Sequence, residues 1–127
     1  MILDTSFVID VLRNRKEAIE KSTQLDNSDE PIFITSISVF ELWQIWNLLG
    51  EKKKRILAEF VDSFGMLSFD SENAQLAGEV QSELMKSGLQ IDPEDCMIAG
   101  IALTSGQAIL TRDKHYSRIK GLKVQSY

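Results

Sequence analysis

The sequence lacks the residues on which disulfide-bonded, zinc-binding and membrane-spanning proteins depend. It holds one cysteine and one histidine, so no intrachain disulfide can form and a zinc site is not expected. A single cysteine favours a reducing, cytoplasmic location. The longest charge-free stretch, residues 96–111, is shorter than the roughly 20 apolar residues of a membrane span. Because Asp4 interrupts the first apolar run, we expect neither a membrane segment nor a signal peptide.

Positive charge is also scarce. The 14 Lys and Arg residues against 19 Asp and Glu residues give a net charge of −5. This balance excludes a nucleic-acid binder that relies on overall positive charge. The hydrophobic share of 43% and the length of 127 residues suit one folded domain. Since no linker, repeat or low-complexity segment interrupts the chain, we expect residues 1–127 to form a single domain.

Short apolar runs alternate with stretches of helical periodicity along the chain. The strand candidates are residues 1–4, 32–35, 66–69, 108–111 and 122–124. The helix candidates are residues 5–12, 18–25, 36–49, 51–64, 71–87 and 92–105. This alternation predicts an α/β fold of three layers, α/β/α, around a mostly parallel sheet of about five strands. Because residues 1–4 have no polar face before Asp4, we predict a central strand there, covered on both sides.

Four carboxylates are expected at one edge of this sheet. Asp4 and Asp113 directly follow strand candidates, while Glu41 and Asp95 lie in the first turns of helix candidates. The carboxyl ends of parallel strands and the helix starts that follow them share an edge, which is where ligands bind. Packed carboxylates repel one another unless a cation lies between them. Oxygen ligands of this kind suit Mg²⁺ or Mn²⁺ acting on phosphates.

Some of these acids also have a structural interpretation. The segment from Asp92 to Asp95, with Pro93 second, is typical of a helix start with an aspartate at the N-cap. Asp113 is equally consistent with the cap of a short helix. Asp4 has no charged neighbour in its apolar segment, which favours a functional role. Glu41 lies in an otherwise apolar helix and therefore needs a partner or a metal.

Aromatic residues crowd the helix predicted over residues 36–49. Trp43 and Trp46 make it apolar on more than one side, which predicts a surface for a partner in addition to a core face. The basic run at residues 52–55 is interpreted as a solvated helix face. His115 and Tyr116 are interpreted as packing or rim contacts.

Taken in order, four segments resemble the PIN domain, and specifically VapC-like toxin ribonucleases. They are MILDTSFVID at residues 1–10, SISVFEL at 36–42, IDPEDCMIAGIAL at 91–103 and ILTRDKHY at 109–116, and residues 121–124 also match. The resemblance assigns the acids of the family's site to Asp4, Glu41, Asp95 and Asp113. It adds Thr5, Ser6, Asp92 and Thr111 as outer contacts around the metal. The chain departs from the family pattern at Gly100, where alanine is common, and at His115-Tyr116, where Asp-Phe is frequent.

The resemblance implies Mg²⁺- or Mn²⁺-dependent hydrolysis of RNA phosphodiester bonds, a homodimer, and a cognate VapB-like antitoxin that occupies a groove near the site. Bound cations would turn an acidic pocket locally positive, which reconciles the net charge with an RNA substrate. Two alternatives remain open. One is a non-catalytic PIN-like module that binds RNA or protein. The other is a phosphoacceptor receiver domain using Asp4, Asp70, Thr111 and Lys123, which leaves Glu41 and Asp95 unexplained.

Overall fold

The strands pair into one parallel sheet of five, in the order β3-β2-β1-β4-β5. The computed structural model describes residues 1–127. The strands are β1 (Ile2–Leu3), β2 (Phe33–Thr35), β3 (Gly65–Leu67), β4 (Ile109–Leu110) and β5 (Val124–Gln125). The central position of β1 confirms the prediction for residues 1–4.

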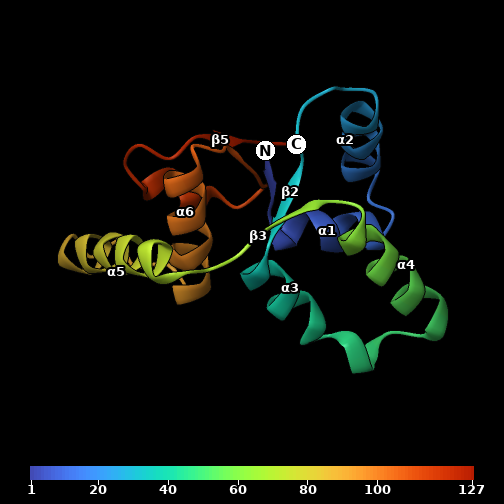
Figure 1. Ribbon diagram of the computed structural model, residues 1–127, viewed down its shortest axis with the longest axis horizontal. Coiled ribbons are helices and arrows are strands. Elements are labelled where there is room, and N and C mark those ends of the chain that lie inside the picture. Colours follow the sequence, from blue (N-terminus) through green and yellow to red (C-terminus); the bar gives the residue numbers. More distant parts are fainter.

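Helices cover both faces of the sheet, which confirms the three-layer α/β/α fold. In Figure 1, α5 and α6 lie on one side of the strands and α1 to α4 on the other. The helices are α1 (Thr5–Leu12), α2 (Lys16–Asp26), α3 (Ser36–Trp43), α4 (Glu51–Asp62), α5 (Ser71–Lys86) and α6 (Pro93–Ser105), with the 3₁₀ helices η1 (Trp46–Leu48) and η2 (Lys114–Arg118). None of them is both long and apolar enough to cross a bilayer.

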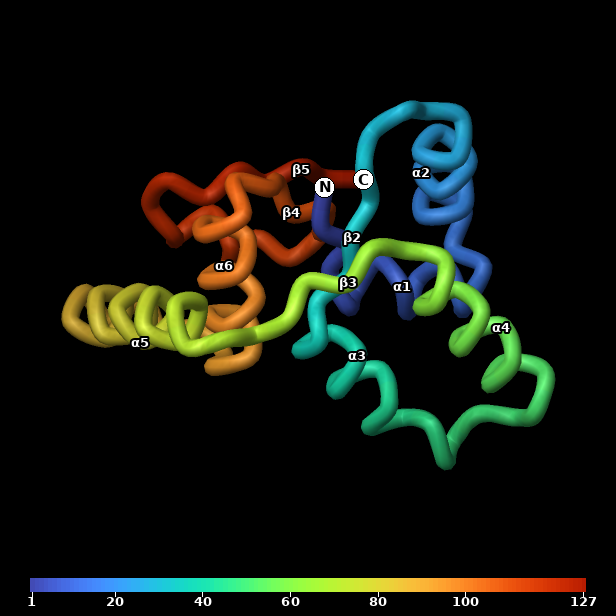
Figure 2. The backbone as a smooth tube through the Cα atoms, viewed as in Figure 1, coloured from blue at the N-terminus to red at the C-terminus, as the bar shows by residue number.

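Strand periodicity divides the apolar residues between two cores. Neighbouring side chains of a strand point to opposite faces. Ile2 and Ile109 therefore pack with α6 on one face, while Leu3 and Leu110 pack with α1 on the other. Figure 2 shows the backbone of the helices on the two sides of the strands, with the two termini close together.

The prediction of one helix over residues 36–49 is wrong in its second half. Helix α3 ends at Trp43, and the chain continues through a turn into η1. Trp43, the last residue of α3, and Trp46, the first residue of η1, stack across this turn with ring centroids 4.9 Å apart and an interplanar angle of 8°. Helical periodicity could not reveal the break, because apolar residues lie on every side of this segment. A smaller difference concerns α4, predicted over residues 51–64, which ends at Asp62, and β3, predicted from residue 66, which begins at Gly65.

Candidate active site

Asp4 connects β1 to α1 and is nearly inaccessible, with 4% of its surface exposed. Its Oδ2 accepts hydrogen bonds from the hydroxyls of Ser6 (2.8 Å) and Thr111 (2.7 Å). Its Oδ1 accepts from the Tyr116 hydroxyl at 3.1 Å. Although Asp4 occupies the N-cap position of α1, its side chain makes no capping bond. The three hydroxyl donors compensate for burial without a cationic partner, and they orient the carboxylate toward the carboxyl edge of the sheet.

Asp95 lies in the first turn of α6 and is half-buried. Burial, reinforced by the charges of Asp4 and Asp113, raises the pKa of Asp95 to about 7, while its hydrogen bond from Tyr116 acts in the opposite direction. Asp92 occupies the N-cap position of α6 as predicted, with Pro93 following, but its side chain makes no capping bond. The acids at this helix start therefore do not serve as hydrogen-bonding caps.

Glu41 reaches the same edge from α3. Its Oε1 accepts a hydrogen bond from the Thr5 hydroxyl at 2.8 Å. Burial raises the pKa of Glu41, as do the charges of Asp4, Glu94 and Asp92, while the bond from Thr5 lowers it. Glu94 is thus a further acid near the site, and the sequence analysis gave it no role there.

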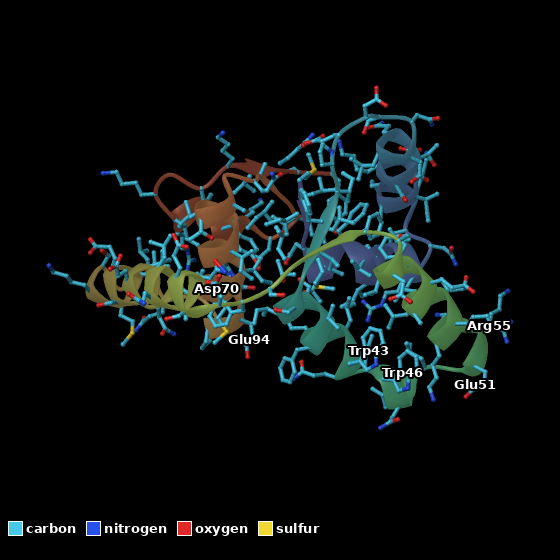
Figure 3. The ribbon with its side chains drawn as sticks, in the orientation of Figure 1. Trp43, Trp46, Glu51, Arg55, Asp70 and Glu94 are labelled. Carbon is cyan, nitrogen blue, oxygen red and sulfur yellow. The ribbon has the colours of Figure 1, made fainter.

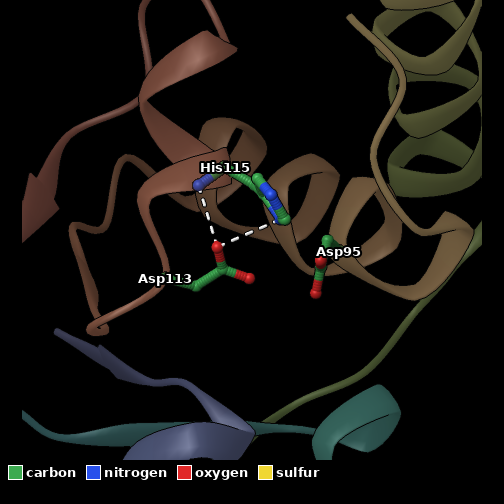
Figure 4. A group of neighbouring side chains, drawn as sticks. All are labelled: Asp95, Asp113 and His115. Atoms are coloured by element: carbon green, nitrogen blue, oxygen red, sulfur yellow. Dashed lines mark hydrogen bonds and ion pairs between the residues drawn. The ribbon is translucent and has the colours of Figure 1, made fainter.

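Asp113 both caps a helix and joins the acidic group. Its Oδ1 accepts from the backbone N–H of His115 at 2.8 Å, which caps η2. Figure 4 shows Asp113, Asp95 and His115 facing one another, and one ligand atom from each lies within 4.8 Å of the others. The capping interpretation of Asp113 is confirmed, and its second oxygen, which the cap does not use, faces no competing hydrogen bond.

Two residues of this region were assigned only packing or rim roles from the sequence. His115 is exposed, but its Nδ1 lies 3.2 Å from Asp113 Oδ1, so it is a nitrogen donor at the mouth of the site. Tyr116 has no exposed surface, and its hydroxyl lies within hydrogen-bonding distance of both Asp4 and Asp95. Burial, with the charges of both carboxylates, raises the pKa of Tyr116, so it remains a donor. Sequence periodicity gave no signal for these contacts, because they join Tyr116 to residues 112 and 21 positions away.

The structure thus places the four predicted acids in one electrostatically coupled group. Asp4, Glu41 and Asp95 form no salt bridge, and the His115 imidazole lies close to Asp113 and Asp95. Thr5, Ser6 and Thr111 hydrogen-bond to these acids, whereas Asp92 is exposed at the rim. Uncompensated negative charge of this kind, carried by oxygen ligands, is suited to a hard divalent cation.

The receiver-domain alternative does not agree with the structure. Asp70 accepts from the backbone N–H of Asn73 at 2.9 Å and caps α5. It follows β3 at the edge of the sheet, two strands away from β1. Asp70 is therefore not part of the acidic group around Asp4, as a phosphoacceptor site would require.

An apolar surface lies near the site, on the segment from α3 to α4. Phe40 is 56% exposed and Leu48 83% exposed. Trp43 and Trp46 project from this segment toward α4 (Figure 3), where the Lys54 ammonium lies 5.5 Å from the Trp46 ring. A cavity of about 190 Å³ lies between η1 and α1. The expected excess of apolar surface is therefore present, and it continues into a groove.

Comparison with known proteins finds relatives whose sequences align with nearly the whole chain. The chain is 28% identical to the tRNA(fMet)-specific endonuclease VapC of Salmonella typhimurium, over 99% of this chain and 96% of the relative. It is 30% identical to ribonuclease VapC1 of Rickettsia felis, over 98% and 93% respectively. The crystal structure of DNA-bound VapBC from Salmonella typhimurium superposes with a TM-score of 0.85 at 27% identity, covering 98% of this chain and 96% of that one.

The chain also matches the sequence profile of a protein family. The PIN domain profile matches residues 1–122, which include every strand of the sheet except β5 and all four acids of the site. The chain is a member of the PIN domain family.

Proposed function

We propose that this protein is a Mg²⁺- or Mn²⁺-dependent endoribonuclease, the toxin of a VapBC-type toxin–antitoxin pair. The observation that carries the proposal is the convergence of Asp4, Glu41, Asp95 and Asp113 at the carboxyl edge of the sheet, with no basic partner for three of them. The VapC relatives, named endonucleases and ribonucleases, support the same activity.

The residues present fit a divalent metal ion. Asp95 and Asp113 each direct an oxygen into the space between α6 and η2, and Asp4 retains acceptor capacity on Oδ1. A carboxylate with a pKa near 7 is ionised more readily once a cation binds beside it. Hard oxygen donors favour Mg²⁺ or Mn²⁺ over softer metals. We propose Asp4, Glu41, Asp95 and Asp113 as ligands, with Thr5, Ser6, Asp92 and Thr111 as outer contacts.

A divalent cation in this position would neutralise phosphate charge and lower the pKa of a water molecule for attack on the phosphodiester. The protein itself orients the carboxylates of the site. Hydroxyls fix Asp4 and Glu41, and the capping bond fixes Asp113. The side chains of the site are thus held before the substrate arrives, which is the arrangement that electrostatic catalysis requires.

We further propose a homodimer and a VapB-like antitoxin as protein partners. The exposed Phe40, Trp43 and Leu48, with the adjoining groove, offer an amphipathic helix a place to bury its apolar face. A related VapBC structure holds both proteins of such a pair. The single buried cysteine agrees with a cytoplasmic protein. Residues 1–127 would provide the nuclease unit as one domain.

The test is cleavage of total cellular RNA, and of initiator tRNA in particular, since that is the substrate in the name of the Salmonella relative. The purified protein is incubated with Mg²⁺, with Mn²⁺ or with chelator, and the new RNA ends are mapped. We expect discrete cleavage with either metal and none with chelator. RNA binding with no cleavage under any metal would instead support the non-catalytic module.

A further inference from the structure

The Tyr116 hydroxyl lies between two carboxylates that come from different parts of the chain. Its oxygen is 3.1 Å from Asp4 Oδ1, at the start of α1, and 3.2 Å from Asp95 Oδ1, in the first turn of α6. A phenol has one proton to donate, so the two acceptors share it. The hydroxyl therefore links the β1–α1 connection to helix α6 at the candidate metal site.

The two carboxylates depend on this hydroxyl to different degrees. Asp4 also accepts hydrogen bonds from Ser6 and Thr111, whereas Asp95 accepts from Tyr116 alone. Without the hydroxyl, Asp4 would keep two of its three donors. Asp95 would be oriented only by its backbone position in α6, and its carboxylate could rotate away from its neighbours.

Packing does not account for the hydroxyl. The Tyr116 ring lies in the core with Ile2, Ile98 and Ile109, where a phenylalanine ring would fill the same space. A fully buried hydroxyl needs a hydrogen-bond partner, and the only partners available to this one are the two site carboxylates. The rigid, enclosed ring thus fixes the position of its hydroxyl, and the hydroxyl in turn fixes the carboxylates.

We propose that Tyr116 is a positioning residue of the metal site, whose hydroxyl fixes Asp4 Oδ1 and Asp95 Oδ1 relative to each other. The proposal rests on the function proposed above. Asp113 precedes Tyr116 by three residues and caps η2, the same 3₁₀ helix. The segment from Asp113 to Tyr116 therefore sets the relative positions of three of the four acids.

The test compares Tyr116→Phe with Tyr127→Phe. Tyr127 provides a control, because its hydroxyl also donates to a buried carboxylate, Asp10 Oδ2, at 2.8 Å, and although it neighbours Ser6 it bonds to none of the four site acids. Mn²⁺ affinity is measured by calorimetry, and folding by metal-free thermal melting. We expect Tyr116→Phe to weaken Mn²⁺ binding by about 10-fold or more, as is typical when a group that orients a metal ligand is lost. Tyr127→Phe should bind Mn²⁺ within about twofold of the parent.

A second measurement uses the parent protein, so the test does not depend on the variant folding. The chain has two tyrosines, whose ring signals can be followed by NMR during titration with Mg²⁺. The Tyr116 ring signals should shift in step with Mg²⁺ binding, while those of Tyr127 stay in place. Unchanged Tyr116 signals, or a Tyr116→Phe protein that binds Mn²⁺ as the parent does, would overturn this proposal alone. A parent that binds neither metal would overturn the metal-dependent function as well.

Discussion

Replacing Asp95 with asparagine should stabilise the metal-free protein at neutral and alkaline pH. Asp95 is half-buried next to other acids, and burial together with Asp4 and Asp113 raises its pKa from 3.8 to about 7. Ionising it in the folded state is therefore costly when no cation is present. Asparagine keeps the shape of the side chain and removes the charge.

The size and the pH window of the effect follow from that pKa. The full shift corresponds to about 4 kcal/mol, and solvent screening of a half-buried group reduces this to about 1–2 kcal/mol. The folded protein binds more protons than the unfolded chain between pH 4 and pH 7, so the stability of the parent falls as pH rises through this window. The stability of the asparagine variant should not fall in this window, because asparagine does not ionise. It should match the parent near pH 4 and exceed it by the full amount above pH 7.

Thermal melting in chelator, from pH 4 to pH 8.5, measures the difference. A gain of 1–2 kcal/mol raises the melting temperature by about 3–10 °C in a domain of this size. Saturating Mg²⁺ should reverse the order, because only the parent gains stability from binding the ion. If the acid instead served the start of α6, its loss would cost about 1 kcal/mol. An Asp95→Asn protein that melts earlier than the parent at pH 8 without metal would refute the reasoning.

Three further predictions concern other parts of the molecule. Asp10→Asn should lower the free energy of unfolding by about 1–3 kcal/mol in urea, because this buried carboxylate accepts from Tyr127 and pairs with Arg15 and Arg112; unchanged stability would count against it. Gly100→Ala should cost about 1–3 kcal/mol, because its Cβ would lie 2.6 Å from a backbone oxygen of α5; a Tm equal to the parent's would contradict this close packing. Trp43→Ala should weaken antitoxin binding by about 10-fold or more in calorimetry while leaving RNA cleavage intact, and an unaltered affinity would remove this surface from the interface.

The fold could be predicted from the sequence because its signals are local. Most strands are short apolar runs, and α4, α5 and α6 each end within three residues of a glycine. The left-handed Gly106, with a φ of 68°, ends α6 as expected. The prediction for the segment after Trp43 was wrong for the opposite reason. Its apolar residues face all sides, and no periodic pattern shows the turn at residues 44–45 that brings Trp43 and Trp46 into stacking contact.

The convergence of the four acids could be predicted from the sequence, whereas the groups that orient them could not. Asp4 and Asp113 follow strands, so a parallel sheet brings them to one edge whatever the details of packing. The hydroxyl of Tyr116 reaches Asp4 across 112 positions of sequence, and its role depends on the exact path of η2. Side-chain hydrogen bonds of this range follow from the tertiary structure, and neither composition nor spacing encodes them.

The central claim is that Asp4, Glu41, Asp95 and Asp113 act together as one metal site for RNA cleavage. The most direct measurement determines Mn²⁺ affinity and RNA cleavage rate side by side for Asp4→Asn, Glu41→Gln, Asp95→Asn and Asp113→Asn, each checked for folding by circular dichroism. The account predicts that all four amide variants fold and that each loses metal affinity and cleavage together. Any folded variant that binds Mn²⁺ and cleaves RNA at the parental rate would contradict it.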